Sequence, residues 1–110
     1  MILRLVDEIL ARSRVSPIIV LQSDHGQLFG ACQSRDFQAC IQDRMSIFSA
    51  YYLPESGAAM LYESITPVNT FRLIFKHYFN ADTDLLEDRC YFSGIKKPFI
   101  FTDVTDPAGK

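Results

Sequence analysis

The sequence has little cysteine, and its cysteines follow no recognisable metal or disulfide pattern. The 110 residues include three: Cys32, Cys40 and Cys90. Their number is odd and no Cys-x-x-Cys pair occurs, so neither a zinc knuckle nor a disulfide framework is supported. The sequence therefore predicts three reduced, partly buried thiols.

The chain also lacks a strong charge bias. Its 11 Lys and Arg residues against 13 Asp and Glu residues give a net charge of -2, and the pI is about 5.6. Nucleic-acid-binding domains carry a basic patch, so we expect no nucleic-acid partner. The pair Lys96-Lys97 is too short to form such a patch and is expected to lie in a solvated turn.

Long apolar runs are absent as well. No segment approaches the roughly 20 apolar residues that cross a bilayer. Asp7 and Glu8 interrupt the basic-then-apolar pattern that is typical of a secretory signal. The sequence thus predicts no membrane segment in this chain and leaves the localisation open.

Aromatic residues, by contrast, are abundant. Nine Phe and five Tyr make up 13% of the chain. A length of 110 residues fits one domain, residues 1–110, and so short a domain buries a smaller share of its surface than a large one. We expect some of the rings to stay exposed, which indicates that the chain is part of something larger.

The hydrophobic pattern of the first half predicts helix followed by strand. Residues 1–13 carry apolar side chains at helical spacing. Ile18–Leu21 is a continuous apolar run, typical of a strand covered on both faces in a parallel sheet. The two form the αβ unit of a doubly wound fold. Residues 27–42 show no period and are expected to form a loop with one helical turn. A second strand is expected within Arg44–Leu53.

The second half begins with the clearest helix start in the chain. Thr66 is the expected N-cap, Pro67 fits the first helical position, and Asn80 is expected to end the helix. An acidic connection over residues 82–89 leads to a last short strand at Pro98–Phe101. The expected fold is α/β, a few-stranded mixed sheet with flanking helices. One apolar stripe follows the helix and consists of Val68, Phe71, Ile74, Phe75, Tyr78 and Phe79.

The apolar run at Ile18–Leu21 stops at two side chains that bind metal ions. Asp24 and His25 lie just after it, and a carboxylate and an imidazole suit zinc, manganese or a related divalent ion. In open α/β sheets, ligands bind just beyond the carboxyl ends of the strands. Gly26 is expected to supply the backbone freedom that brings both side chains together. The spacing alone also fits a capping aspartate beside a surface histidine, with no metal ion. Two ligands would also form only an incomplete metal site.

Three segments resemble one enzyme family, in the same order. Residues 18–26, IIVLQSDHG, are similar to the metal-binding segment of the alkaline phosphatase superfamily, in its sulfatase-like branch. Residues 44–54, RMSIFSAYYLP, resemble the following strand of that family, and residues 65–79, ITPVNTFRLIFKHYF, resemble its late helix. The resemblance implies a partial alkaline-phosphatase/sulfatase-like sandwich. It also implies that Asp24 and His25 bind a divalent metal ion (manganese, zinc or calcium) in a hydrolase of sulfate or phosphate esters.

The family's nucleophile has no counterpart in this chain. In the family it is a Ser, Thr or modified Cys far upstream of the Ser-Asp-His-Gly segment, beside another acidic ligand. Ser13, Ser16 and Ser23 do not lie in that context. The resemblance therefore implies a C-terminal fragment of the catalytic domain that is inactive alone, and its expected partner is the missing N-terminal part.

Two further family features have weak counterparts. Many sulfatases place a sulfate-contacting Lys soon after the Asp-His pair, but only Arg35 precedes Arg44 here, and we do not assign it that role. His77 is the only downstream histidine and is expected on the surface of its helix, which favours a single-metal arrangement. Arg44 is expected either to pair with an acid near the site or to be a plain surface arginine.

A function of a different class stays open. The chain would then be a small non-catalytic α/β module that self-associates and binds a protein partner. The aromatic stripe, which is core in the parent fold, would form the homodimer interface. Asp103 and Asp106 resemble paired catalytic carboxylates, but turn and capping acids are the interpretation that we favour. Only the hydrolase needs Asp24 and His25 for metal binding.

Overall fold

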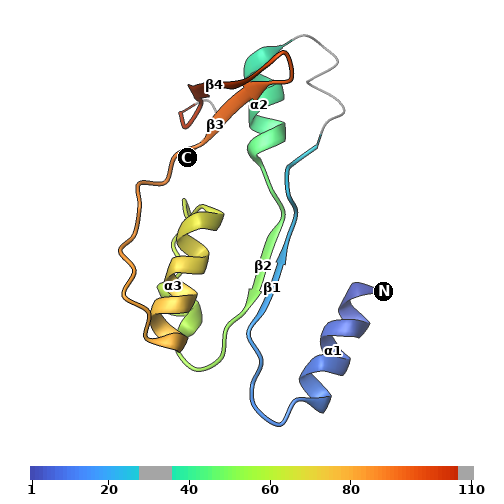
Figure 1. Ribbon diagram of the computed structural model, residues 1–110. Coiled ribbons are helices and arrows are strands. Elements are labelled where there is room, and N and C mark those ends of the chain that lie inside the picture. Colours follow the sequence, from blue (N-terminus) through green and yellow to red (C-terminus); the bar gives the residue numbers. More distant parts are fainter. Residues whose placement is uncertain (28–35, 107–110) are drawn as a thin grey trace.

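The computed structural model describes residues 1–27 and 36–106. Within these ranges the chain alternates helices with short strands, so the expected α/β class is confirmed at this level (Figure 1). The elements are α1 (Ile2–Arg12), β1 (Ile19–Gln22), α2 (Phe37–Met45), β2 (Ser49–Tyr52), the 3-10 helix η1 (Gly57–Met60), α3 (Pro67–Phe79), β3 (Tyr91–Gly94) and β4 (Lys97–Asp103).

The strands form two separate antiparallel pairs. In the first pair, Ile19 of β1 lies opposite Tyr52 of β2. In the second, Tyr91 of β3 lies opposite Asp103 of β4. The prediction of a mixed sheet with a parallel strand is wrong for the described residues. The connection through α2 stands beyond the ends of β1 and β2 and turns the chain back, whereas a parallel pairing needs a crossover along the sheet (Figure 1).

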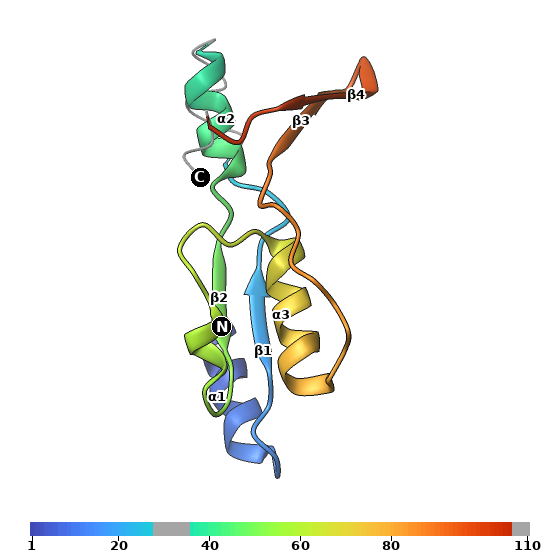
Figure 2. The same cartoon turned by 90° about the vertical axis from the view of Figure 1, so that its left-hand side faces the viewer.

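Two helices lie on opposite sides of the β1–β2 pair (Figures 1 and 2). The predicted N-terminal helix is confirmed as α1, yet none of its residues is buried. α3 is tied to β2 on the other side, where the Tyr51 hydroxyl lies 3.3 Å from Thr70 Oγ1. In the part of the chain that the structure describes, no helix is long and apolar enough to cross a membrane.

A loop with one helical turn was expected over residues 27–42, but α2 occupies residues 37–42, while residues 28–35 lie outside the described residues. The Asp36 side chain accepts a hydrogen bond from the Ala39 N–H at 3.1 Å and caps the helix. Ile41 is its only buried residue, so the segment carries no amphipathic stripe from which a helix could be predicted. Because α2 extends to Met45, the second strand begins at Ser49 and not at Arg44.

α3 begins and ends where the sequence predicts. Pro67 stands in its first turn after the N-cap Thr66, and Asn80 ends the helix in the left-handed conformation, with φ of 55°. Thr66 makes no side-chain cap on its own helix. Asp88 takes that place, as its Oδ1 accepts the Thr66 N–H at 2.7 Å. An acid at a helix N-terminus is also favourable to the helix dipole.

The predicted apolar stripe of α3 faces mostly outward. Of its six residues only Ile74 is buried, whereas Phe71, Phe75 and Phe79 are 42%, 48% and 63% exposed. Their rings pack in a row, with centroids 6.4 Å and 5.9 Å apart. The buried face of α3 instead includes Asn69 and Thr70. The expectation that some aromatic rings stay exposed is confirmed, and the prediction that the stripe is core in the parent fold is not tested by this chain alone.

Polar side chains bind the acidic connection over residues 82–89 to α3. Asn69 makes two hydrogen bonds with the backbone of Leu86, donating from Nδ2 to the carbonyl at 2.7 Å and accepting the N–H on Oδ1 at 2.9 Å. Asp88 accepts hydrogen bonds from the hydroxyls of Tyr62 and Thr66. These contacts hold an extended segment in place without a strand pairing.

The last hairpin confirms the predicted strand at Pro98–Phe101 and adds β3, which the sequence did not predict. Every residue of β4 is exposed, and Phe99 is 89% exposed. Lys96 lies in the turn of this hairpin, as expected. The chain then returns, since the Val104 N–H donates to the Cys90 carbonyl at 2.8 Å and the Val104 side chain is buried.

The chain is more open than a monomeric domain of its size. Its radius of gyration is 16.8 Å, against about 13 Å expected for this length. Its accessible surface is 8418 Å², against about 6,200 Å² expected for a folded protein of this mass. In residues 1–27 and 36–106 the buried apolar core consists of Ile41, Leu53, Ile74 and Val104. Much apolar surface is thus left uncovered.

We expect Asp88→Asn to lower the free energy of unfolding by about 2 kcal/mol at pH 7, because hydrogen bonds to a charged group are lost. Burial alone would raise the pKa of the Asp88 carboxyl, but hydrogen bonds from Thr66 and Tyr62 outweigh it and hold that pKa below its ordinary value. This contribution is full above about pH 4 and is lost as the pH falls through the folded-state pKa.

Urea unfolding at pH 7 and pH 3 measures this effect. The difference between wild type and Asp88→Asn should shrink at pH 3. Asp82→Asn is the matched control, since Asp82 is an exposed acid of the same segment. Equal stability of wild type and Asp88→Asn at pH 7 would contradict the assignment.

Candidate metal site at the end of β1

The pairing of β1 continues for one residue beyond the strand and then stops. The Ser23 N–H donates to the Phe48 carbonyl at 3.0 Å, and Ser23 Oγ accepts the Phe48 N–H at 2.9 Å. The hydroxyl thus takes the place of the backbone carbonyl that would have continued the ladder. The predicted strand end is confirmed, and Asp24 is the first residue free of the pairing.

The loop after β1 lies against the end of α2 at Gly26. The Gly26 N–H donates to the Arg44 carbonyl at 2.7 Å. A Cβ at this position would lie 1.9 Å from the Asp43 carbonyl oxygen and 2.7 Å from that of Ser46. The structure does not place Gly26 in the left-handed region. The glycine is therefore needed for this close approach and not, as the sequence suggested, for turn freedom.

Asp24 and His25 direct their side chains toward each other. The Asp24 side chain is 88% exposed, and its Oδ1 accepts the His25 N–H at 3.0 Å. His25 Nδ1 lies 2.6 Å from the Gly26 carbonyl oxygen. A carbonyl only accepts, so Nδ1 carries the proton and donates it. In the neutral ring this leaves the lone pair on Nε2, which lies 3.7 Å from Asp24 Oδ2.

This geometry fits two ligands of one metal ion. The ligand atoms of a tetrahedral zinc site lie about 3.4 Å apart, close to the distance of 3.7 Å between Nε2 and Oδ2. Metal-binding histidines also commonly donate their second ring N–H to a carbonyl, which fixes the tautomer. With His25 protonated, the same contact is an exposed ion pair of little stabilising value.

Further ligands are not gathered around this pair. Among the described residues, no three His, Cys, Asp or Glu side chains are grouped so that they could hold a metal ion. His77 is exposed on the surface of α3, as the sequence predicts. The centroid of its ring lies 4.7 Å from that of the Tyr78 ring. Asp24 and His25 would therefore supply only part of the ligands of a metal site.

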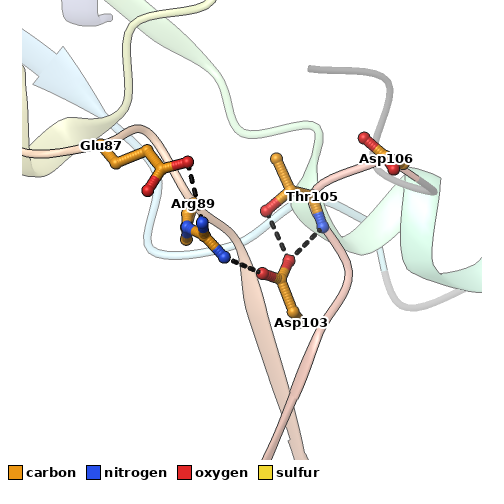
Figure 3. A pocket seen from close by; sticks show the side chains of 5 residues that line it. All are labelled: Glu87, Arg89, Asp103, Thr105 and Asp106. Carbon is orange, nitrogen blue, oxygen red and sulfur yellow. Dashed lines mark hydrogen bonds and ion pairs between the residues drawn. The ribbon is translucent and has the colours of Figure 1, made fainter.

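The Asp103 carboxylate is held within its own turn and by Arg89. Asp103 Oδ1 accepts the N–H and the hydroxyl of Thr105 at 3.0 Å and 2.6 Å, and these bonds, followed by Arg89, lower the pKa of Asp103. The favoured interpretation of Asp103 as a turn acid is confirmed. The hydrogen bonds that the Arg89 guanidinium donates to Glu87 and to Asp103 raise the pKa of Arg89 (Figure 3).

A cavity of about 420 Å³ lies at this cluster (Figure 3). Arg89 Nη2 lies 2.9 Å from Glu87 Oε1, and Nη1 lies 2.8 Å from Asp103 Oδ2. The guanidinium is thus occupied by two carboxylates. The sequence singled out Asp103 and Asp106 but not Glu87 and Arg89, because Arg89 meets Asp103 only through the β3–β4 hairpin.

A second cavity, of about 340 Å³, adjoins the candidate metal ligands, since Asp24 belongs to its wall. Its other lining residues come from the end of β1, the α2–β2 connection, the start of α3 and the segment before β3. They are Gln22, Ser23, Met45, Ile47, Thr66, Pro67, Arg89 and Cys90.

The remaining candidates of the sequence have other surroundings. Arg44 carries a buried Nη1 without a hydrogen-bond partner in residues 1–27 and 36–106, so neither expected role describes it. Ser13 Oγ donates to the Ile9 carbonyl at 2.7 Å, and the Ser23 hydroxyl serves the strand end. Arg35 lies outside the described residues.

The prediction of three reduced thiols is wrong, because the chain contains a disulfide-bonded cysteine. Cys40 is disulfide-bonded, whereas Cys90 is a free, partly buried thiol. Cys32 lies outside the described residues. An odd cysteine count therefore did not exclude a disulfide.

Comparison with protein-family models, with curated proteins and with solved structures finds no match to this chain. The likeness to the sulfatase-like branch thus stays a prediction from the three sequence segments.

We expect Gly26→Ala to lower the free energy of unfolding by roughly 1–3 kcal/mol, because the new methyl group meets fixed backbone oxygens. Gly94→Ala is the matched control, since a Cβ there meets nothing within 4 Å. It should change stability by less than about 0.5 kcal/mol. Urea unfolding of both variants measures the difference, and equal effects would contradict the close approach at Gly26.

Proposed function

We propose that this chain is the C-terminal part of a metal-dependent hydrolase of sulfate or phosphate esters. The proposed parent belongs to the alkaline phosphatase superfamily, in its sulfatase-like branch. One observation carries the proposal: His25 Nε2 and Asp24 Oδ2 lie 3.7 Å apart at the end of β1, with His25 Nδ1 directed at the Gly26 carbonyl. The Ser-Asp-His-Gly resemblance points to the same two side chains.

Each residue of this segment has a distinct part in the proposed site. Asp24 supplies negative charge, and neutral His25 supplies a nitrogen lone pair. The Gly26 carbonyl holds the imidazole in the tautomer that leaves Nε2 free. Ser23 fixes where the strand ends. A bound divalent ion, manganese, zinc or calcium, would activate the attacking group and stabilise charge on a phosphoryl or sulfuryl oxygen.

The other half of the site comes from outside this chain in our proposal. Two protein ligands hold an ion weakly, and the nucleophile of the family has no counterpart here. The open shape supports this view, because the surface exceeds that of a compact protein by roughly 2,200 Å². That excess is larger than the roughly 800 Å² that each partner buries in a standard interface. The proposed partner is the N-terminal part of the parent domain, and the chain alone is inactive.

Calorimetric titration with Mn²⁺ and Zn²⁺ tests the metal site. We expect wild type to bind and Asp24→Asn/His25→Asn to bind at least about tenfold more weakly, since both donors are changed. His77→Asn is the matched control, because His77 is an exposed histidine on α3. It should bind as wild type does. Identical isotherms for wild type and the double variant would refute the hydrolase proposal.

A second candidate is the small non-catalytic α/β module that self-associates and binds a protein partner. The exposed row of Phe71, Phe75 and Phe79 favours it, since large apolar patches mark interaction surfaces. In this case a homodimer would cover the row, and Asp24 and His25 would be dispensable.

Sedimentation equilibrium separates the two candidates. The module predicts a dimer that Phe75→Ser weakens at least about tenfold, because a half-exposed ring is removed from the row. Phe101→Ser is the control, as it removes an exposed ring from β4. A monomer at all concentrations, or equal weakening by both changes, would argue against a dimer through α3.

A further inference from the structure

We propose that the cavity beside Asp24 receives the alcohol portion of the ester, and that this portion is uncharged and largely apolar. The inference rests on the proposed hydrolase function and names its substrate class. Asp24 belongs both to the candidate ligand pair and to the wall of the cavity of about 340 Å³. An ester held at Asp24 and His25 therefore has this space next to it.

The cavity wall is built largely from apolar groups. Met45 lines it from the end of α2, Ile47 from the α2–β2 connection, and Pro67 from the first turn of α3. Cys90 adds a free thiol, which behaves as a small hydrophobic group with only weak hydrogen bonding. These surfaces favour a guest that loses no water hydrogen bonds when it enters.

Most polar groups of the wall are already occupied. Ser23 Oγ accepts the Phe48 N–H, and Thr66 Oγ1 donates to Asp88 at 2.5 Å. With Ser23 and Thr66 occupied, Gln22 is the one uncharged polar side chain of the lining that is left for a guest. A guest with several hydroxyl groups thus finds few partners, and each unpaired hydroxyl weakens binding about tenfold or more.

A second anionic group on the substrate is also disfavoured. Arg89 is the cation of the lining, and its guanidinium lies between Glu87 Oε1 at 2.9 Å and Asp103 Oδ2 at 2.8 Å. Two carboxylates around one guanidinium leave no net positive charge for a further phosphate or carboxylate.

The cavity is large enough for a ring, since an apolar cavity of about 150 Å³ already holds benzene.

A matched pair of ring alcohols tests the inference on the ¹⁵N-labelled chain by NMR titration. Cyclohexanol and myo-inositol share one carbon ring and differ in having one or six hydroxyls. We expect cyclohexanol to shift the amides of Met45, Ile47 and Cys90, with a Kd on the order of tens of millimolar. myo-Inositol should bind at least about tenfold more weakly. Equal shifts from both alcohols, or none from cyclohexanol, would overturn the inference.

Variants separate this inference from the metal site. Ile47→Ser should weaken cyclohexanol binding severalfold, while Ile95→Ser, at a fully exposed position, should leave it unchanged. His25→Asn should weaken Mn²⁺ binding at least about tenfold and keep cyclohexanol binding, because His25 does not line the cavity. If wild type binds cyclohexanol but no Mn²⁺, the hydrolase proposal fails and the leaving-group assignment with it. If it binds Mn²⁺ but not cyclohexanol, only the substrate class is wrong. The wild-type titration decides even where Ile47→Ser does not fold.

Discussion

The hydrogen bonds to the Asp88 carboxylate tie the segment before the β3–β4 hairpin to the start of α3. Asp88 accepts the N–H and the hydroxyl of Thr66 and the hydroxyl of Tyr62. They fix an extended segment without strand pairing at the N-terminus of α3. The next residues, Arg89 and Cys90, thereby line the same cavity as Asp24. Asp24 lies just after β1 and far from Arg89 in the sequence. Without this anchor the cavity would lose one wall, because the hairpin that follows makes few other contacts with the strands near the site.

The candidate ligand pair depends on how β1 ends. A serine hydroxyl stops the ladder at Ser23, and Gly26 brings the loop within hydrogen-bond distance of the Arg44 carbonyl. These two fixed points confine the backbone of Asp24 and His25 between them. The order of the segment Ser-Asp-His-Gly thus has a physical meaning: the outer two residues fix the backbone, and the inner two present the donors. The open surface of the chain fits the same picture, in which the rest of the site packs against it.

Local signals in the sequence predicted local structure well. Pro67 and Asn80 marked the ends of α3, and the apolar run before Gln22 marked β1. Contacts between residues that are distant in the sequence could not be predicted from these local signals. Asn69 is buried inside α3 because its amide meets the backbone of Leu86, and no periodicity shows this. The same holds for the antiparallel pairing, for α2 with a single buried residue, and for the ion pairs of Arg89 with Glu87 and Asp103. For the site, the sequence predicted the two donors, while their spacing and tautomer needed the structure.

The central claim is that His25 presents a free Nε2 beside Asp24 while its Nδ1–H is held by the Gly26 carbonyl. A long-range ¹H–¹⁵N NMR spectrum of the imidazole, recorded in alkaline buffer where such rings are neutral, tests it most directly. The account predicts the proton on Nδ1 and, on addition of Zn²⁺, a large shift of the Nε2 resonance alone. A proton on Nε2, or a spectrum unchanged by Zn²⁺, would contradict it.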